Sequence, residues 1–175
     1  MKIAFFDSGI GGITVLKEAL DILPEQEYIY YADTENVPYG IKPKEEVKQY
    51  IFEAVEFIVA QEVDALVVAC NTATSIAIKD LRANYDFPIL GMEPAVKPAV
   101  KKCDQKKVLA VATPLTLKED KFQDLVAEVD PGNIVDSLGL PELVEFAEDF
   151  VFTEEVIIDY LQNRLSAYDL QDYGT

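Results

Sequence analysis

Cys70 is the residue of this 175-residue sequence that is best placed for proton chemistry. It follows an apolar run at residues 65–69 and precedes a predicted helix. A cysteine at the beginning of a helix lies near the positive end of the helix dipole, which favours thiolate over thiol. A thiolate can remove a proton or act as a nucleophile. The alternative is an inert, buried cysteine. The hydrogen-bonding side chains that follow Cys70 argue against an inert cysteine, because an anion-binding segment would use them. They are Asn71, Thr72, Thr74 and Ser75.

The segment that begins with Asp7 and Ser8, DSGIGG, joins the first predicted strand to the first predicted helix. It can be a tight turn in which Asp7 or Ser8 caps the helix. It can also bind phosphate, although neither GK[ST] nor GxGxxG is present. A third hypothesis is that the carboxylate of Asp7 orients, or exchanges a proton with, a neighbouring group.

A second loop contains Pro38, Tyr39 and Gly40. Proline and glycine around a tyrosine are typical of a rigid surface turn. The functional alternative is a preorganised loop whose backbone N–H groups receive a carboxylate. The residues alone do not favour either interpretation.

Further candidates lie in the second half of the chain. Thr113 and Thr116 flank Pro114 where a helix is expected to begin. Helix capping explains one of them, and a bound carboxylate would use both. Glu145 lies in a predicted helix, where a solvent-exposed acid is the ordinary interpretation. Cys103 lies among lysines and is interpreted as structurally incidental.

Composition limits the classes of function. The chain has no histidine, which excludes Ser-His-Asp and Cys-His catalysis and every His-ligated metal site. The net charge of −17 disfavours nucleic acid and anionic membranes as partners, because both bind clustered cations. Two cysteines do not make a disulfide framework, and no apolar run reaches membrane-spanning length. We therefore expect a cytoplasmic protein with reduced thiols.

Strands and helices are predicted to alternate along the chain. The predicted strands are residues 2–6, 28–32, 65–69, 88–91, 108–112 and 134–135. The predicted helices are residues 13–23, a long one from Pro43, one from the CNTAT segment to about Asn84, one from 93–95, one from near Thr113, and 140–148 and 154–168. This alternation predicts an α/β fold with a parallel sheet.

Ligands of parallel α/β sheets bind beyond the carboxyl ends of the strands, so the polar segments above can share one crevice. We expect a division near residues 92–98 into two lobes. Residues 1–92 would form the first lobe, which carries Asp7 and Cys70, and residues 93–175 the second.

Together these segments resemble the glutamate racemases of the aspartate/glutamate racemase family. The matching segments are FDSGIGG (6–12), YADTENVPYG (31–40), ALVVACNTAT (65–74) and GMEPAVKPA (91–99), with looser matches in VLAVATPLTL (108–117) and LPELVEF (140–146). The resemblance implies a flavodoxin-like fold. It also implies interconversion of L- and D-glutamate without cofactor or metal, which supplies D-glutamate for bacterial peptidoglycan.

The resemblance also implies roles for individual residues. The family uses two cysteines on opposite faces of the substrate, of which Cys70 matches one, with Asp7 as its assisting carboxylate. Glu145 matches an acid that assists the second cysteine. The residues expected to bind the amino acid are Ser8, Pro38, Tyr39, Gly40, Asn71, Thr72, Thr113 and Thr116.

The sequence departs from the family in one respect. The family's second catalytic cysteine belongs to a Gly-Cys-Thr-His segment after a later strand, whereas this sequence ends at Thr175, where that strand is expected to begin. Cys103 has different surroundings and does not replace it. We therefore expect an incomplete second lobe and no racemisation by a two-base route.

Other hypotheses remain open. One is a racemase of aspartate or another amino acid. Another is a non-catalytic protein that binds acidic amino acids, or a fragment that forms a homodimer to cover its open face.

Overall fold

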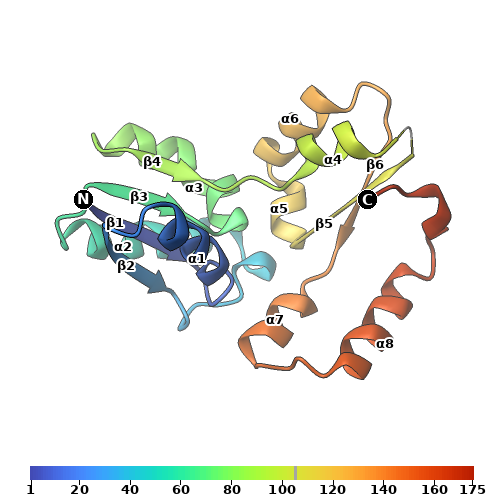
Figure 1. The fold of residues 1–175 in the computed structure, drawn as a ribbon, viewed down its shortest axis with the longest axis horizontal. Coiled ribbons are helices and arrows are strands. Elements are labelled where there is room, and N and C mark those ends of the chain that lie inside the picture. Colours follow the sequence, from blue (N-terminus) through green and yellow to red (C-terminus); the bar gives the residue numbers. More distant parts are fainter. Residues whose placement is uncertain (105) are drawn as a thin grey trace. The chain divides into compact units, whose positions relative to one another are not determined.

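The structure of the protein is a computed structural model that describes residues 1–104 and 106–175. The chain divides into two units, Met1–Glu93 and Pro94–Thr175, each with its own parallel sheet (Figure 1). The two units are described separately.

A four-stranded parallel sheet forms the centre of the first unit, in the order β2-β1-β3-β4. Its strands are β1 (Lys2–Asp7), β2 (Glu27–Ala32), β3 (Ala65–Val68) and β4 (Ile89–Gly91). This order corresponds to the first four strands of a flavodoxin-like sheet, so the predicted parallel α/β architecture is confirmed. Phe6 of β1 is in register with both Tyr31 and Val68, so these three strands end at one level.

The helices of the first unit are α1 (Ile13–Ile22), α2 (Lys44–Val59) and α3 (Asn71–Asn84). The chain steps from β1 outward to β2 and then back across the sheet to β3. Right-handed crossovers therefore place α1 on one face of the sheet and α2 and α3 on the other. The apolar face of α2 is buried at Val47, Ile51, Ala54, Val55 and Ile58.

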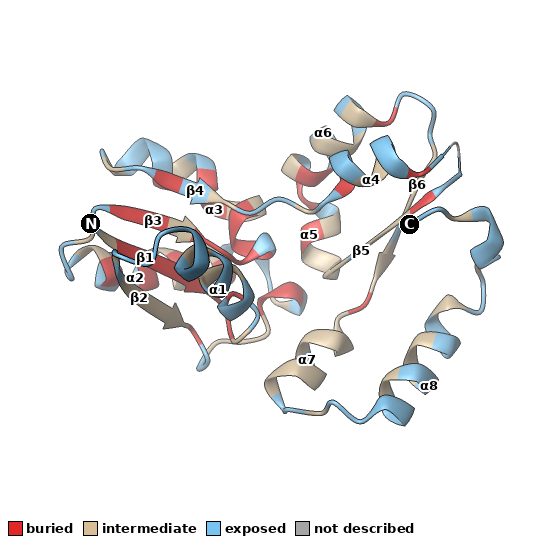
Figure 2. Ribbon diagram, in the orientation of Figure 1, coloured by how far each residue is buried: buried red, intermediate tan, exposed pale blue. Residues whose placement is uncertain are grey.

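Helix α1 buries less of its surface than α2. Its partly buried side chains Val15, Leu16 and Ala19 pack against the cluster of Ile3, Phe5 and Ala65. Two further apolar residues are exposed, Leu20 of α1 by 43% and Leu23, its C-cap residue, by 46%. Figure 2 shows α1 without buried residues, whereas β1 and β3 of the sheet beneath it are largely buried.

The turn between β1 and α1 is packed tightly against the ends of two strands. A Cβ atom at Gly12 would lie 2.7 Å from the Cβ of Asp7 and 2.9 Å from the Cβ of Ala69. The hydroxyl of Tyr30 donates a hydrogen bond of 2.7 Å to the carbonyl of Gly9. Residue 12 therefore requires glycine because the backbone approaches β1 and β3 closely.

The second unit contains a parallel pair of strands, β5 (Val108–Ala112) and β6 (Val135–Gly139). Its helices are α4 (Val96–Lys102), α5 (Pro114–Lys118), α6 (Asp120–Val129), α7 (Glu142–Glu148) and α8 (Glu154–Leu165). Strand β5 has the predicted bounds. The helix predicted from near Thr113 is in fact two helices, because Glu119 adopts an extended backbone (ψ 138°) between them.

Strand β6 is longer than the predicted 134–135. It continues through Asp136 and Ser137 to Gly139, residue types with weak strand preference, because each of its residues pairs with β5. The carboxylate of buried Asp130 accepts bonds of 2.9 Å from the backbone N–H groups of Ile134 and Val135, which stabilises the turn before this strand.

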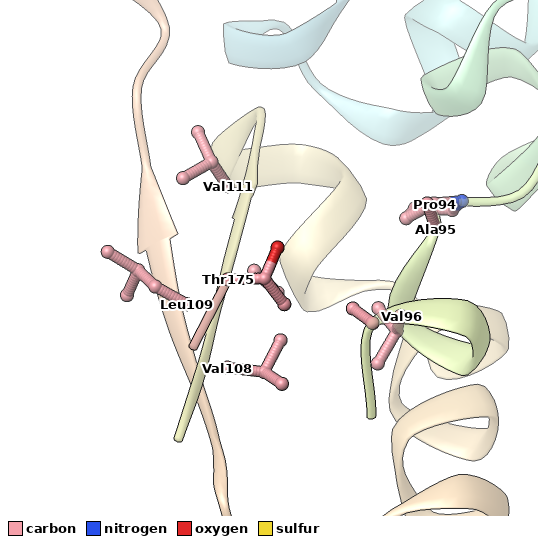
Figure 3. Close-up of a pocket in the computed structure, with 9 residues that line it drawn as sticks. Pro94, Ala95, Val96, Val108, Leu109, Val111 and Thr175 are labelled. Carbon is pink, nitrogen blue, oxygen red and sulfur yellow. The ribbon is translucent and has the colours of Figure 1, made fainter. Parts of the chain in front are cut away.

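The last residues of the chain lie along the other edge of β5. The N–H of Gly174 donates to the carbonyl of Lys107, and the N–H of Leu109 donates to the carbonyl of Thr175, both at 2.9 Å. A hollow of about 210 Å³ beside Thr175 is lined mainly by apolar residues of β5 and of the segment that begins α4 (Figure 3).

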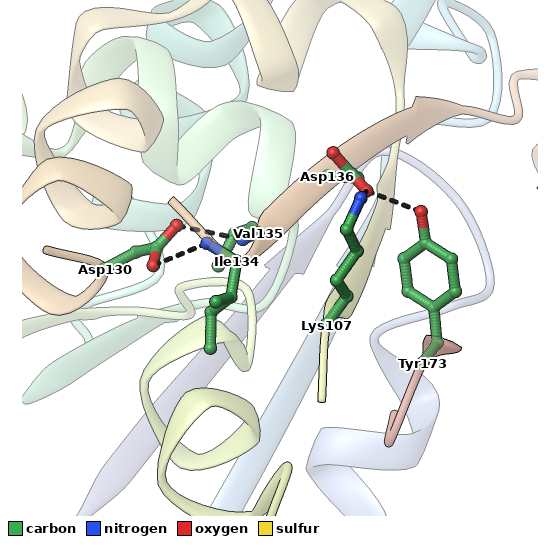
Figure 4. A network of polar contacts seen from close by, with 6 residues as sticks. All are labelled: Lys107, Asp130, Ile134, Val135, Asp136 and Tyr173. Carbon is green, nitrogen blue, oxygen red and sulfur yellow. Dashed lines mark hydrogen bonds and ion pairs between the residues drawn. The ribbon is translucent and has the colours of Figure 1, made fainter. Parts of the chain in front are cut away.

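A polar network holds this terminal segment (Figure 4). The hydroxyl of Tyr173 donates to Asp136 at 2.5 Å, and the ammonium of Lys107 lies 3.2 Å from the same carboxylate oxygen. These two donors lower the pKa of Asp136.

Over the described part of the chain, no helix combines the length and apolarity needed to cross a membrane.

We predict that Gly12→Ala lowers the free energy of unfolding by about 1–3 kcal/mol, the usual cost of overpacking. The added methyl group would overlap the Cβ atoms of Asp7 and Ala69. Urea unfolding followed by circular dichroism measures the effect. Gly11→Ala is the matched control, because its Cβ would meet only an atom of Asp7 at 3.8 Å. Equal losses in the two variants would contradict the proposed close packing.

Candidate active site

Cys70 lies at the carboxyl end of β3 and is the N-cap residue of α3, as predicted. Its Sγ accepts a hydrogen bond from the backbone N–H of Ala73 at 3.3 Å. The hydroxyl of Ser8 lies 3.6 Å from the same sulfur. Cys70 is 6% exposed, so its sulfur is nearly enclosed. The Ala73 N–H and the Ser8 hydroxyl give it two polar neighbours.

The predicted preference of Cys70 for the thiolate is wrong. Burial raises the pKa of the Cys70 thiol, and the negative charge of Asp7 raises it further. Hydrogen bonds from the backbone N–H of Ala73 and from Ser8 act in the opposite direction but are outweighed. The sequence pattern identified the helix terminus, whereas the loss of water around the sulfur has the larger effect.

Asp7 is the last residue of β1 and Ser8 follows it, next to the position of Cys70 after β3. Both are buried, at 8% and 9% exposure. One carboxylate oxygen of Asp7 accepts a bond of 2.8 Å from the N–H of Gly9, which orients the side chain within the turn. The parallel sheet therefore brings together Asp7, Ser8 and Cys70, three residues that were predicted to share a site.

The loop after β2 is held by a second carboxylate, that of Asp33. Tyr39, in a short 3-10 helix (Tyr39–Ile41), donates its hydroxyl to Asp33 at 2.5 Å. The side-chain amide of Asn36 donates to both oxygens of Asp33, at 3.0 and 3.1 Å. The peptide bond between Val37 and Pro38 is cis. The loop is therefore an ordered structure with its own buried anchor.

The side chain of Tyr39 points into this loop. Tyr39 is 1% exposed. Burial and the hydrogen bond to Asp33 are the main causes of its raised pKa, and the charge of Cys70 contributes as well. The phenol is thus an anchor that lies within electrostatic range of the sulfur. What the loop can offer a carboxylate is backbone N–H groups such as that of buried Gly40, whereas half-buried Pro38 has no N–H.

The first turn of α3 supplies two differently placed polar residues. Asn71 is exposed, whereas Thr72 is 4% exposed. The hydroxyl of Thr74, one turn further, donates to the carbonyl of Val68 and accepts from the N–H of Met92, both at 3.1 Å. Thr74 therefore joins α3 to the ends of β3 and β4, and Asn71 is left at the surface.

The second unit contains the remaining predicted residues. Thr113 caps α5 by accepting from the N–H of Thr116 at 3.3 Å, and their hydroxyl oxygens lie 2.9 Å apart. Glu145 is exposed on α7. Cys103 is 3% exposed, and its thiol donates to the carbonyl of Val100 at 3.1 Å. Helix capping is therefore confirmed for Thr113, and Cys103 has a structural environment.

Sequence reasoning missed Asp33 as a site residue. Its position immediately after a strand, like that of Asp7, was the available signal. Within residues 1–104 and 106–175, no group of three or more acids or cysteines could hold a metal ion. The first unit instead presents a sulfur, a carboxylate, a hydroxyl and helix N–H groups, which are the groups required for proton transfer at an anionic ligand.

We predict that Cys70 reacts with iodoacetamide with a pH midpoint above about 8.5, the pKa of a free cysteine. The raised pKa means that the sulfur keeps its proton to higher pH. Asp7→Asn should shift the midpoint downward, because one of the two causes is removed. Mass spectrometry of the Cys70 peptide in a Cys103→Ser background measures it. A midpoint below that of free cysteine would disprove the proposed balance.

We predict that Tyr39→Phe lowers the free energy of unfolding by about 1–3 kcal/mol, because buried Asp33 loses a donor. The difference from the unsubstituted chain should shrink above pH about 10, where the unfolded tyrosine loses its proton and the folded one retains it. Urea unfolding across pH measures both effects. Tyr50→Phe is the control and should cost less, because its bond to Glu46 is only partly buried.

Comparison with known proteins adds independent evidence. Residues 14–154 match the family described as Asp/Glu/Hydantoin racemase. Over its whole length the chain is 67% identical to a glutamate racemase of Halothermothrix orenii and 64% identical to glutamate racemase 2 of Bacillus subtilis. It spans 69% and 67% of those relatives.

Solved structures agree with the sequences. The Escherichia coli glutamate racemase, in complex with L-glutamate and the activator UDP-MurNAc-Ala, matches with a TM-score of 0.86 at 33% identity. The match covers 95% of this chain and 63% of that one, so the chain spans less than two thirds of this relative. The Campylobacter jejuni enzyme matches with a TM-score of 0.82 at 31% identity. The chain therefore belongs to the Asp/Glu/Hydantoin racemase family, and the relatives named here are glutamate racemases.

Proposed function

We propose that the protein acts on glutamate as a cofactor-independent racemase and that Cys70 transfers the α-proton. One observation carries the proposal: at the end of the sheet, the Cys70 sulfur has a helix N–H, a serine hydroxyl and the charge of Asp7 around it. This combination of groups can bind a zwitterionic amino acid and move a proton. The names of the relatives support glutamate as the substrate.

The α-ammonium of the substrate would interact with the carboxylate of Asp7. A positive charge there offsets the effect of Asp7 on the sulfur, and so lowers the pKa of Cys70 toward the range where it ionises. The thiolate then takes the proton from the α-carbon, and electron density moves onto the substrate carboxylate. A thiolate whose pKa remains high is also a stronger base.

Backbone and hydroxyl donors would hold the substrate during this transfer. The loop of Pro38, Tyr39 and Gly40 and the α3 residues Asn71 and Thr72 would bind its carboxylates, together with Ser8. N–H groups at a helix N-terminus stabilise the charge that develops there. Such donors need no reorganisation when the proton moves, which is what lowers the barrier.

Within the second unit, the proposed functional residues are Thr113, Thr116 and Glu145. The paired threonine hydroxyls suit a carboxylate, and exposed Glu145 would assist the family's second cysteine. As part of the same proposal, the activity takes place in the cytoplasm and supplies D-glutamate for peptidoglycan.

Cys103 would not act as a second base, because its buried thiol donates to a backbone carbonyl. We therefore predict that the 175-residue chain exchanges the α-proton of one glutamate enantiomer in D₂O with retention of configuration, and racemises it slowly or not at all. Cys70→Ser should reduce exchange by about 100-fold or more, the usual contribution of a general base.

Proton NMR measures the loss of the α-proton, and chiral chromatography measures inversion. Cys103→Ser is the matched thiol control and should exchange like the unsubstituted chain, and aspartate is the control substrate. Exchange that persists unchanged in Cys70→Ser would refute the role of the sulfur. Faster exchange of aspartate than of glutamate would refute the substrate.

A further inference from the structure

Asp33 is a buried carboxylate for which neither the sequence nor the resemblance gave a role. It is 6% exposed and follows β2 directly. Its oxygens accept from the Tyr39 hydroxyl and from the side-chain amide of Asn36. Its own N–H donates to the carbonyl of Asp7 at 3.1 Å. One residue thus connects the end of β1, which carries Asp7, with the loop that carries Tyr39.

A carboxylate in this position is costly for a simple turn. Removing a charge from water is unfavourable unless hydrogen bonds compensate it, and here three donor contacts do so. A solvent-exposed turn would need no such arrangement. Because its oxygens already accept bonds from the loop, Asp33 is placed to organise the loop rather than to contact a ligand.

The loop is also held at its C-terminal end, by Lys42. The ammonium of Lys42 donates to the carbonyl of Asn36 and lies 5.4 Å from the ring centre of Tyr50 on α2. Asn36 therefore joins two anchors, with its amide on Asp33 and its carbonyl on Lys42. Between these anchors lie Pro38, Tyr39 and Gly40, the residues whose backbone would meet the substrate.

We propose that Asp33 is a positioning residue for substrate binding. It holds the Tyr39 phenol, and through it the backbone of Pro38–Gly40, at the end of the sheet where Cys70 lies. This inference rests on the proposed function, because it assigns the loop a ligand. It predicts that loss of Asp33 weakens binding and leaves the chemistry of the sulfur unchanged, since the oxygens of Asp33 bond to Asn36 and Tyr39 of the loop and not to Cys70.

Four variants of the full 175-residue chain test this role: Asp33→Ala, Asp33→Asn, the double variant Asp33→Asn/Asn36→Asp, and Glu35→Gln. The double variant keeps one carboxylate and one amide in the network, so it should restore the hydrogen bonds that hold the loop. Glu35→Gln is the matched control, because it removes an exposed negative charge of the same loop outside this network. Calorimetry gives the Kd for glutamate, D₂O exchange gives the rate at saturation, and alkylation gives the pH midpoint of Cys70.

We expect Asp33→Ala to raise the Kd about tenfold, the factor that the loss of one good hydrogen bond is worth. The exchange rate at saturation and the alkylation midpoint should stay close to those of the unsubstituted chain. The Kd of Asp33→Asn should lie between those of Asp33→Ala and the unsubstituted chain. The double variant and Glu35→Gln should bind glutamate with an unchanged Kd. All measurements use conditions in which circular dichroism shows each variant to be folded.

The outcomes separate the two proposals. An unchanged Kd in folded Asp33→Ala would mean that Asp33 only stabilises the fold, and would overturn the positioning role alone. Glutamate binding without α-proton exchange in the unsubstituted chain would overturn the proposed function as a catalyst, while the effect of Asp33 on the Kd could still be measured. Absence of glutamate binding in the unsubstituted chain would overturn both.

Discussion

The site depends on hydrogen bonding on both sides of β1. The ladder continues past the strands themselves, because the N–H of Asp33 donates to the carbonyl of Asp7 and the N–H of Ala69 donates to the carbonyl of Phe6. The residues that follow three different strands are thereby held at one level. A parallel sheet makes this arrangement general, because all of its strands end at the same edge. The close approach at Gly12 adds to the constraint by pressing the first turn against both β1 and β3.

The sulfur of Cys70 is subject to opposing effects that this arrangement creates. Enclosure and the charge of Asp7 favour the neutral thiol, while the Ala73 N–H and Ser8 favour the thiolate. Enclosure has the largest effect, so the pKa of the thiol is raised. A buried thiol that keeps its proton avoids the large cost of an unpaired buried anion. The same enclosure leaves the sulfur little contact with water.

The polar groups of the first unit are paired with one another within the fold. Tyr39, Asn36 and Asp33 satisfy one another, and Thr74 joins α3 to β3 and β4. Across the described residues, no buried side-chain nitrogen or oxygen without a hydrogen-bond partner was found. Such networks are rigid because breaking one bond leaves a desolvated group unpaired. Preorganisation of this kind lowers the cost of binding, since less motion is lost when a ligand is held.

The sequence by itself determined the features that depend on local patterns. The apolar run at residues 108–112 predicted the bounds of β5, and the strand–helix junction predicted Cys70 at the N-cap of α3. Only the tertiary structure decided the direction of the Cys70 pKa shift and the anchoring of Tyr39 by Asp33. It also decided the length of β6 and the break at Glu119. Each of these depends on burial or on a partner distant in sequence, and a local pattern of residues contains no information about what lies across the fold.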